Sequence, residues 1–355
     1  MADGFDPVFR ATQPVINIGG QDDSALSSSL VSVVIRENTN GLYRSEVLFD
    51  NWGQKNNSLD FLYFDRQTLD FGKALKIKFG ADTFFEGRIM AVEAQFGAVR
   101  TPQINVLAED RFQDLRMTRR TRTFADVSDS DVINQIASDY GLTPNVSVNG
   151  PTYKVLAQIN QSDLAFLRER ARTIDAELWM AGNTLNAKSH TDRGNGTLEM
   201  IHGGKLHEFS VIADLAMQRT SVSVNGWDVS SKRALQHESD DSIINSELNG
   251  DTSGPSLLQS AFGTRKESLV HTIPLTTQEA QSTADAFFKM SARRFVVGHG
   301  IAETDVNLRV GSYVNLSGVG SMFSGKYCVT EVRHMFDRSR GLRTEFTAER
   351  PGIGR

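Results

Sequence analysis

Short runs in which apolar and polar residues alternate dominate the first hundred positions. Strict alternation places one face of a strand against a core and the other in water. Such runs occupy residues 30–36, 45–50, 75–79, 84–93 and 103–108. The segment Asn38-Thr-Asn-Gly41 between the first two is a good hairpin turn. Six or so short strands at this spacing indicate a β-barrel or a β-sandwich.

Helical periodicity begins after residue 127. Ser128 and Asp131 resemble a capping box, with an acidic residue in place of the usual Glu or Gln, and predict a helix over residues 128–140. Its apolar face consists of Val132, Ile136 and Tyr140. A second helix follows from Gln161, and its apolar face consists of Leu164, Leu167, Ala171 and Ile174. Thr276 and Glu279 form a full capping-box pattern, which predicts a third helix that ends near Arg294.

The rest of the chain returns to strand patterns. Short alternating runs occupy residues 313–316, 325–332 and 342–349. An isolated strand at residues 220–228 has no local partner, so we expect it to pair with these C-terminal strands. The second β domain would then be discontinuous. Residues 238–263 are polar and predict a long surface loop.

Composition describes an ordinary globular protein, and it narrows the function. The chain has 355 residues, enough for two or more domains. A net charge of -5 argues against nucleic-acid recognition. One local segment is nevertheless basic and contains Arg116, Arg119, Arg120 and Arg122. No aromatic residue is interleaved with it, so we expect it to face protein or to form intersubunit salt bridges, with nucleic-acid binding as the alternative.

The cysteine content, the length of apolar runs and the N-terminal residues indicate where the protein is assembled. Cys328 is the single cysteine, which excludes an internal disulfide and a thiolate metal cage, and it is predicted to be a small buried hydrophobe. No apolar run reaches the roughly 20 residues that a membrane helix needs. The acidic N-terminus does not resemble a secretory signal, so we expect assembly in the bacterial cytoplasm.

One segment imitates a nucleotide-binding motif. Gly320-Ser-Met-Phe-Ser-Gly-Lys326 fits seven positions of a phosphate-binding P-loop. The eighth position is Tyr327, where Mg²⁺ coordination requires Ser or Thr. A strand follows instead of the helix whose N-terminus would face the phosphate, so the segment is predicted to be a hairpin turn.

The histidines and acidic pairs do not combine into a predicted site. His202 and His207 are five residues apart, which places them on opposite sides of a strand, so they are predicted to flank the intervening Gly-Gly turn. His334 lies in a predicted strand, and Asp240 with Asp241 lies in the polar loop. Gly-x-Ser-x-Gly and His-Glu-x-x-His are absent from the sequence. We therefore predict no catalytic, cofactor-binding or metal-binding residue, no cofactor, and no enzymatic activity.

The order of motifs resembles a known family. A basic turn precedes a helix that closes on Tyr140-Gly-Leu142, followed by Gln161-Ser-Asp-Leu-Ala-Phe-Leu-Arg-Glu-Arg170 and a hairpin with Leu178-Trp179. Later matching segments are Val222-Ser-Val-Asn-Gly-Trp-Asp228, Gly311-Ser-Tyr-Val-Asn-Leu316, Gly325-Lys-Tyr-Cys-Val-Thr-Glu-Val-Arg-His334 and Phe346-Thr-Ala-Glu349. This series resembles the late control gene D family of contractile phage tails. That family includes tail hub proteins and the N-terminal part of the valine-glycine repeat proteins of type VI secretion.

The resemblance implies a fold and a division into domains. The fold would be α+β and mostly β, with two similar tube-like β-barrel domains and two α/β insertions. The first tube-like domain would cover residues 1–115, and the second would combine residues 210–232 with 300–355. The insertions would cover residues 116–209 and 233–299.

The resemblance also implies a function. The chain would be a structural baseplate hub, a homotrimeric ring that adapts a six-fold tail tube to a three-fold spike in a virion or a phage-tail-like particle. Partners would be tube or tube-initiator proteins, with a tape measure or cargo in the lumen. The sequence stops without a needle domain, so a separate spike protein is expected. The turns at residues 38–41 and 80–82 are predicted to contact the tube.

Two functions from other classes stay open at this stage. A tail-associated cell-wall hydrolase would need a convergent acid/base pair, and turnover on cell-wall fragments would reveal it. A monomeric carbohydrate-binding β module would need exposed aromatic platforms, for which the chain offers Trp52, Trp179 and Trp227. The oligomeric state separates this module from a hub.

Overall fold

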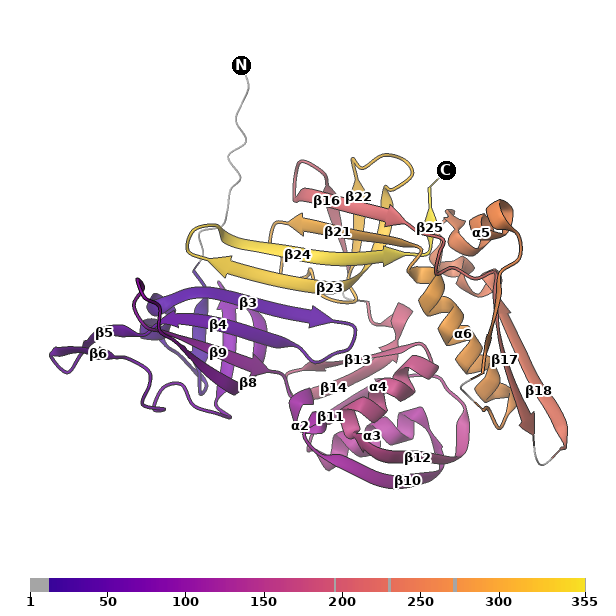
Figure 1. Cartoon of the computed structure of the whole chain (residues 1–355), viewed down its shortest axis with the longest axis horizontal. Helices are drawn as coiled ribbons and strands as arrows, with labels where there is room; N and C mark the ends of the chain where they lie inside the picture. The colour runs from indigo at the N-terminus through magenta and orange to yellow at the C-terminus, as the bar shows by residue number, and fades with distance from the viewer. Residues whose placement is uncertain (1–12, 195, 229–230, 271–272, 355) are drawn as a thin grey trace, which may run out of the picture.

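Four packed units make up the structure, a computed structural model that describes residues 13–194, 196–228, 231–270 and 273–354 (Figure 1). Two β units lie along one long sheet, an α/β unit packs below them in this view, and an outer unit with a long helix lies at the right. The chain is mostly β with several helices. Among the described residues, no helix is both long and apolar enough to cross a membrane.

The first β unit contains nine strands and one short helix. Its elements are β1 (Val15–Ile18), β2 (Gln21–Asp22), α1 (Ser24–Ser29), β3 (Leu30–Asn38), β4 (Arg44–Asp50), β5 (Trp52–Lys55), β6 (Ser58–Phe61), β7 (Ala74–Phe79), β8 (Asp82–Gln95) and β9 (Gln103–Glu109). The alternation predicted from the sequence is confirmed, because every second residue of β9 is buried. Fully buried Ile35, Val47 and Val106 belong to one core.

The α/β unit follows directly in the sequence. Its elements are α2 (Phe112–Arg116), β10 (Arg119–Ser128), α3 (Asp129–Asp139), β11 (Thr143–Ser147), β12 (Thr152–Ser162), α4 (Asp163–Thr173), β13 (Ala176–Ala181), β14 (Thr184–Ser189) and the 3-10 turn η1 (His190–Asp192). The predicted capping box is confirmed: the Ser128 hydroxyl accepts from the Asp131 amide, and the Asp131 carboxylate accepts from the Ser128 amide. Both predicted helices of this region are present.

The second β unit is assembled from distant parts of the chain. Its strands are β15 (Thr197–Ile201), β16 (Leu206–Ala213), β21 (Val296–Ala302), β22 (Tyr313–Ser317), β23 (Gly325–Asp337) and β24 (Gly341–Arg350). β16 pairs with β21, which pairs with β24, so a strand from before residue 220 does join the C-terminal strands. The predicted discontinuity is therefore present, although a different strand produces it.

The predicted partner of the isolated strand is wrong. That segment is β17 (Ser221–Asp228), which pairs with β18 (Arg233–Asp240) and β20 (Lys266–Leu269) in a separate sheet. Helix α6 (Thr277–Arg293), the third predicted helix, packs on this sheet through Val222, Val224 and Phe288. The pairing was missed because β18 is almost entirely polar and looks like a loop in the sequence.

The predicted long loop is wrong as well. Residues 238–263 contain the end of β18, the 3-10 helix η2 (Asp241–Glu247), strand β19 (Thr252–Ser253) and helix α5 (Gly254–Phe262). α5 is capped by the Ser253 hydroxyl and carries a proline in its first turn. β19 pairs with β25 (Gly352–Ile353), which ties this outer unit to the end of the chain.

The two β units share one sheet, and no strand pairing among the described residues closes either of them into a barrel. The thirteen-residue strand β23 is the reason. One of its edges pairs with β24, while the other pairs first with β22 and then with β3. The hydrogen bonds that would close a barrel inside one unit are instead used to join the two units. The prediction of two separate barrels is therefore wrong.

A buried histidine at this junction predicts a pH effect on stability. His334 is fully buried, its Nδ1 lies 2.8 Å from Thr344 Oγ1, and its ring contacts Phe84 edge-on. Burial, with a smaller effect of the Arg309 charge, lowers the pKa of His334 to about 3. The unfolded chain therefore takes up a proton below pH ~6.5 that the native chain excludes, so stability is lost as the pH falls.

Wild type is expected to lose about 2 kcal/mol more stability than His334→Gln between pH 7 and pH 5. Glutamine has no group that titrates in this range, so only the wild type carries this part of the slope. Urea denaturation of both proteins at the two pH values measures the difference. Parallel losses would show that His334 is as easily protonated in the native chain as in the unfolded one.

Candidate functional site

The feature that stands out is a continuous face of the shared sheet. Eight strands in the order β16-β21-β24-β23-β3-β4-β9-β8 form its main part. One face carries the core residues, for example Ile35 and Phe346. The other face carries their sequence neighbours, such as Arg36 and Glu345, because side chains alternate along a strand. Each β unit contributes four neighbouring strands to this surface.

Strand register aligns charged residues across all eight strands. Paired residues point to the same face, so one row can be followed from strand to strand. The row consists of Glu208, Ile301, Glu345, Arg333, Arg36, Arg44, Glu109 and Arg88. Seven of these eight residues are charged, with both signs represented. Such a face is suited to water and not to burial in a protein core.

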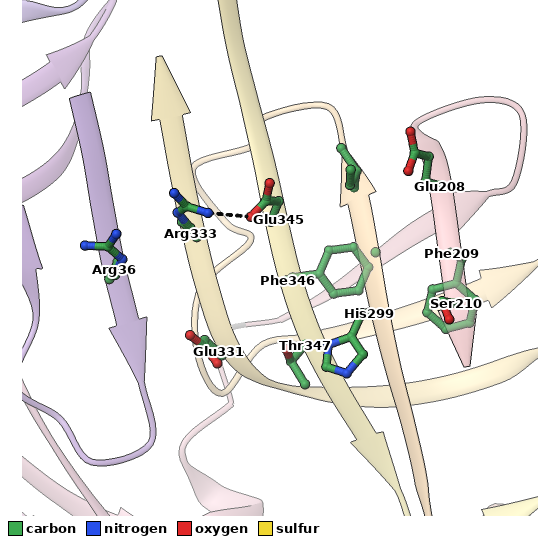
Figure 2. A pocket seen from close by; sticks show the side chains of 12 residues that line it. Arg36, Glu208, Phe209, Ser210, His299, Glu331, Arg333, Glu345, Phe346 and Thr347 are labelled. Carbon is green, nitrogen blue, oxygen red and sulfur yellow. Dashed lines mark hydrogen bonds and ion pairs between the residues drawn. The ribbon is translucent and has the colours of Figure 1, made fainter. Parts of the chain in front are cut away.

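A hollow of about 690 Å³ lies on this face where the two β units meet. Figure 2 shows side chains from β3, β23, β24, β21 and β16 around it. The Arg333 guanidinium donates to Glu345 at 3.1 Å, and Arg36 forms an ion pair with Glu46 of β4. His299 Nδ1 lies 3.0 Å from the Thr347 hydroxyl. The hollow thus holds polar pairs between neighbouring strands.

Both ends of the eight-stranded segment have free backbone. β16 pairs only with β21, apart from a single bridge at Leu206, and its outer edge has no partner strand among the described residues. At the other end, the first half of β8 pairs with β7, but residues 90–95 pair only with β9. Unpaired edges offer rows of N–H and C=O groups to another chain. Glu93 and Ser210 lie near the middle of these two free edges and are exposed.

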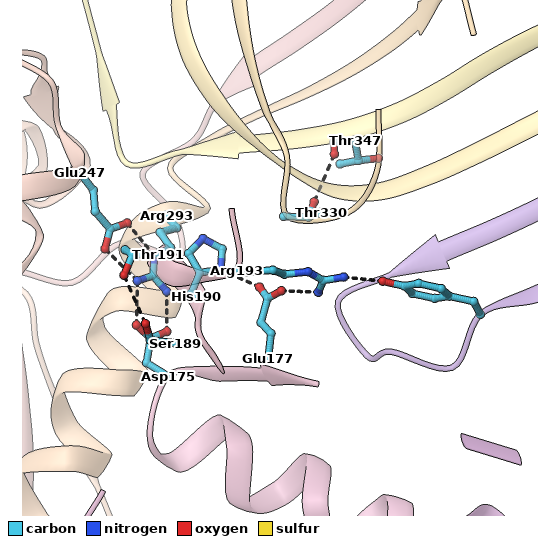
Figure 3. Close-up of polar contacts among 11 residues, drawn as sticks. Asp175, Glu177, Ser189, His190, Thr191, Arg193, Glu247, Arg293, Thr330 and Thr347 are labelled. Atoms are coloured by element: carbon cyan, nitrogen blue, oxygen red, sulfur yellow. Dashed lines mark hydrogen bonds and ion pairs between the residues drawn. The ribbon is translucent and has the colours of Figure 1, made fainter. Parts of the chain in front are cut away.

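Buried arginines fix the units relative to one another. Arg193, only 3% exposed, donates to Glu177 of β13 and to the Tyr43 hydroxyl of the first β unit, and it stacks on Trp179 (Figure 3). Arg309 pairs with the buried Glu37 of β3. These contacts connect the first β unit to the α/β unit and to the second β unit.

Arg293 makes the connection to the outer unit. It lies at the end of α6 and forms ion pairs with Asp175, which follows α4, and with Glu247 of η2 (Figure 3). The two carboxylates outweigh the effect of burial and raise the pKa of Arg293 above its ordinary value. The guanidinium is therefore a permanently charged link between the outer unit and the α/β unit.

The comparisons with known proteins bear on this architecture. A model of the family described as Alg8 N-terminal domain matches residues 12–337, which is nearly the whole chain. The chain belongs to this family. No curated protein matches its sequence.

Several solved structures of tail proteins share the fold of this chain. The 43 kDa tail protein of prophage MuSo2 from Shewanella oneidensis has 10% identity and a TM-score of 0.71 over 96% of this chain and 98% of its own. The tail protein of Neisseria meningitidis MC58 has 12% identity and a TM-score of 0.68 over 96% and 97%. The E. coli c3393 protein, a type VI secretion component, has 11% identity and a TM-score of 0.58 over 96% and 76%. At such identities the likeness establishes a shared fold.

The segments of this chain that resemble a phosphate-binding or metal-binding motif have structural roles. Residues 318–324 connect the antiparallel strands β22 and β23, and Gly325 and Lys326 begin β23, where Lys326 lies over the Tyr313 ring at 4.0 Å, so the predicted hairpin is confirmed. His202 and His207 flank a turn closed by a hydrogen bond from the Gly203 amide to the Leu206 carbonyl, also as predicted. No group of three or more His, Cys, Asp or Glu suited to a metal ion occurs in the part of the chain that the structure describes.

The basic run forms salt bridges within the α/β unit and with the first β unit. Arg120 and Arg122 both pair with the fully buried Asp163, at 3.0 and 2.7 Å, and Arg122 also pairs with Asp139. Arg116 pairs with Glu109. The prediction that these arginines form salt bridges is therefore confirmed. The four salt bridges named here lie within one subunit and not between subunits. The prediction missed this because Asp163 lies more than forty residues from the run.

One of the two turns predicted to contact the tube packs against another unit of the same chain. The turn at residues 38–41 packs against the α/β unit, where Arg168 donates to the Asn40 carbonyl at 2.6 Å and Arg172 to its side chain at 3.0 Å. The turn at residues 80–82 lines a hollow of about 570 Å³ that it shares with β15 and β16. The first turn therefore joins two units of one subunit, and contact of either turn with the tube stays a prediction.

Proposed function

We propose that this chain is a non-enzymatic baseplate hub of a contractile tail or contractile injection system. Three copies form a ring that adapts a six-fold tail tube to a three-fold spike. The observation that carries the proposal is the eight-stranded segment with a charged face and two unpaired ends. The shared fold with phage and type VI tail proteins supports it.

The unpaired ends account for assembly. β16 of one copy meets the free half of β8 of the next, so each contact joins two different edges. A contact of this heterologous kind generates a ring when its rotation closes. Closure after three copies removes both exposed edges, which are otherwise sites of aggregation. The barrel that is absent from one subunit is in this account completed by three.

The two β units account for the change of symmetry. Each unit contributes four neighbouring strands, so a three-fold ring presents six similar surfaces to the tube. We assign β1–β9 to the first tube-like domain and the α/β unit, from α2 to η1, to its insertion. The second tube-like domain consists of β15, β16 and β21–β24, with the outer unit as the second insertion.

The charged row accounts for the lumen. If the common face turns inward, Arg36, Arg333 and Glu345 line a water-filled passage for cargo, a genome or a tape measure. The mixture of signs avoids trapping a strongly charged passenger. The tube would dock on the six-surfaced side of the ring, and the spike would be held below.

The experiment that tests this proposal is a cross-link between the two free edges. In a Cys328→Ser background, Glu93→Cys and Ser210→Cys together are expected to give covalent dimers and trimers with a short bismaleimide. Each variant alone gives monomers, because the contact joins unlike edges. A control pair joins Glu93→Cys to Gln236→Cys, which lies on exposed β18 in the outer unit. Equal yields from the two pairs, or none from the first, would refute the edge contact.

A further inference from the structure

Arginines from four elements gather where β9 ends. Glu109, the last residue of β9, lies opposite Arg44 of β4 on one side and Arg88 of β8 on the other in strand register. Paired residues point to the same face of a sheet, so these three side chains are neighbours. Arg116, at the end of α2, reaches the same carboxylate at 2.5 Å. One carboxylate therefore has three arginines beside it.

Helix α4 adds two further arginines to this group. Arg168 and Arg172 are one helical turn apart, and both donate to oxygens of Asn40, an uncharged residue. α2 packs against α4 (Figure 1). Burial, with the positive charges of Arg172 and Arg116, lowers the pKa of Arg168, so the three charges lie within reach of one another. We call the following five residues the basic cluster: Arg44, Arg88, Arg116, Arg168 and Arg172.

The carboxylates that form ion pairs with the basic cluster do not balance its charge. They are Glu109 and Asp114, and Asp114 is shared with Arg111, which lies outside the cluster. Four members of the cluster are exposed and one is half-buried. The members that form no ion pair among the described residues are Arg44, Arg168 and Arg172.

Two further acidic residues close to the cluster in the sequence do not neutralise it. Asp110 is 4% exposed and accepts hydrogen bonds from the backbone amides of Tyr43 and Phe112, both at 2.9 Å. Glu169 of α4 accepts from the Gln161 side chain at 2.8 Å. The cluster is thus a local surplus of positive charge on a chain whose net charge is -5. Like charges at such spacings repel each other, and an external anion relieves this repulsion.

The residue types favour a protein ligand with carboxylates. Every cation in the basic cluster is an arginine, whose planar guanidinium donates two parallel hydrogen bonds to a carboxylate or a phosphate. Met117 follows Arg116 in the chain and is 68% exposed. Arginine and methionine are both enriched at protein–protein interfaces. The cluster itself offers no aromatic ring on which the bases of a single-stranded nucleic acid could stack.

We propose that the basic cluster is a docking surface for an acidic segment of another polypeptide. Carboxylates of that segment pair with Arg44, Arg168 and Arg172, which have no ion-pair partner among the described residues. Met117 supplies an apolar contact beside them. The inference goes beyond the hub proposal and does not rest on the edge contact, because every residue of this surface belongs to one subunit.

The test measures binding of a fluorescein-labelled decaglutamate peptide to the full-length protein by fluorescence anisotropy. An oligothymidine of the same length with the same label is the nucleic-acid probe. We expect the peptide to bind at low salt and to lose about tenfold in affinity between about 50 and about 300 mM salt, because salt screens exposed charges. We expect the oligothymidine to bind more weakly than the peptide.

Variants compare the basic cluster with arginines elsewhere. Arg44→Gln combined with Arg172→Gln is expected to weaken peptide binding by about tenfold. The control pair, Arg100→Gln with Arg340→Gln, removes the same charge from two exposed arginines at the opposite end of the shared sheet, and is expected to leave binding unchanged. Arg44→Gln alone, with an expected loss of about threefold, serves should the first pair not fold.

Three outcomes overturn the proposal. Failure of the peptide to bind at low salt shows that the cluster takes no acidic segment. Equal losses in the two paired variants show an effect of overall charge. An oligothymidine that binds as tightly as the peptide, and that is lost in the same variant, shows a nucleic-acid surface instead. None of these results bears on the edge contact, which the cross-linking experiment tests separately.

Discussion

Replacement of Arg293 by alanine is expected to lower the free energy of unfolding by about 3–5 kcal/mol. Arg293 is 6% exposed. Its guanidinium forms ion pairs with Asp175 at 2.5 Å and with Glu247 at 2.7 Å. Alanine leaves both carboxylates in their partly buried positions without a counter-ion. Most of the loss therefore comes from the cost of uncompensated charge and not from the value of the pairs themselves. Urea denaturation of wild type and variant measures it.

The next residue in the chain supplies a matched control. Arg294 has the same side chain, but that side chain is 70% exposed and lies 3.7 Å from Glu349. Arg294→Ala is expected to change stability by no more than about 0.5 kcal/mol, because exposed ion pairs contribute little. Similar losses in the two variants would show that Arg293 does not hold the outer unit in place.

Gly41→Ala is expected to destabilise the chain by about 3 kcal/mol or more. Gly41 has a φ of +85°, which an L-residue adopts only with strain. An added Cβ would also lie 2.2 Å from the carbonyl oxygen of Leu178 in the α/β unit. Either the turn or β13 must then move, and overpacking of this kind adds its own cost. Thermal or urea unfolding of the purified variant measures the loss.

Gly20→Ala separates strain from contact. Gly20 has a φ of +92°, and nothing lies within 4 Å of the position that a Cβ would take. We expect it to lose about 1–2 kcal/mol, the cost of the backbone conformation alone. The excess in Gly41→Ala then reports the packing of the turn at residues 38–41 against the α/β unit. Equal losses would mean that this packing is loose.

The sequence predicted elements well where local chemistry defines them. Capping patterns predicted where two helices begin, at Ser128 with Asp131 and at Thr276 with Glu279. Both helices are present. β9 and β24 alternate strictly and are strands with alternating burial. Local patterns could not predict β18, because its partner β17 and helix α6 bury only Leu235 and Ser239 among polar neighbours.

The candidate site could not be predicted because it depends on register and on distant partners. Arg36 and Arg333 are ordinary charged residues in separate strands until the pairing of β3 with β23 places them in one row. Arg293 and Asp175 are 118 residues apart, so no spacing rule connects them. The barrel prediction failed for the same reason, since one long strand serves both β units.

The mass of the purified protein in solution, measured by light scattering with electron microscopy of the same peak, tests the hub account most directly. The account predicts three times the mass of the 39.2 kDa chain and ring-shaped particles with a central hole. A chain that remains a compact monomer, both alone and mixed with the spike protein of its particle, would contradict it.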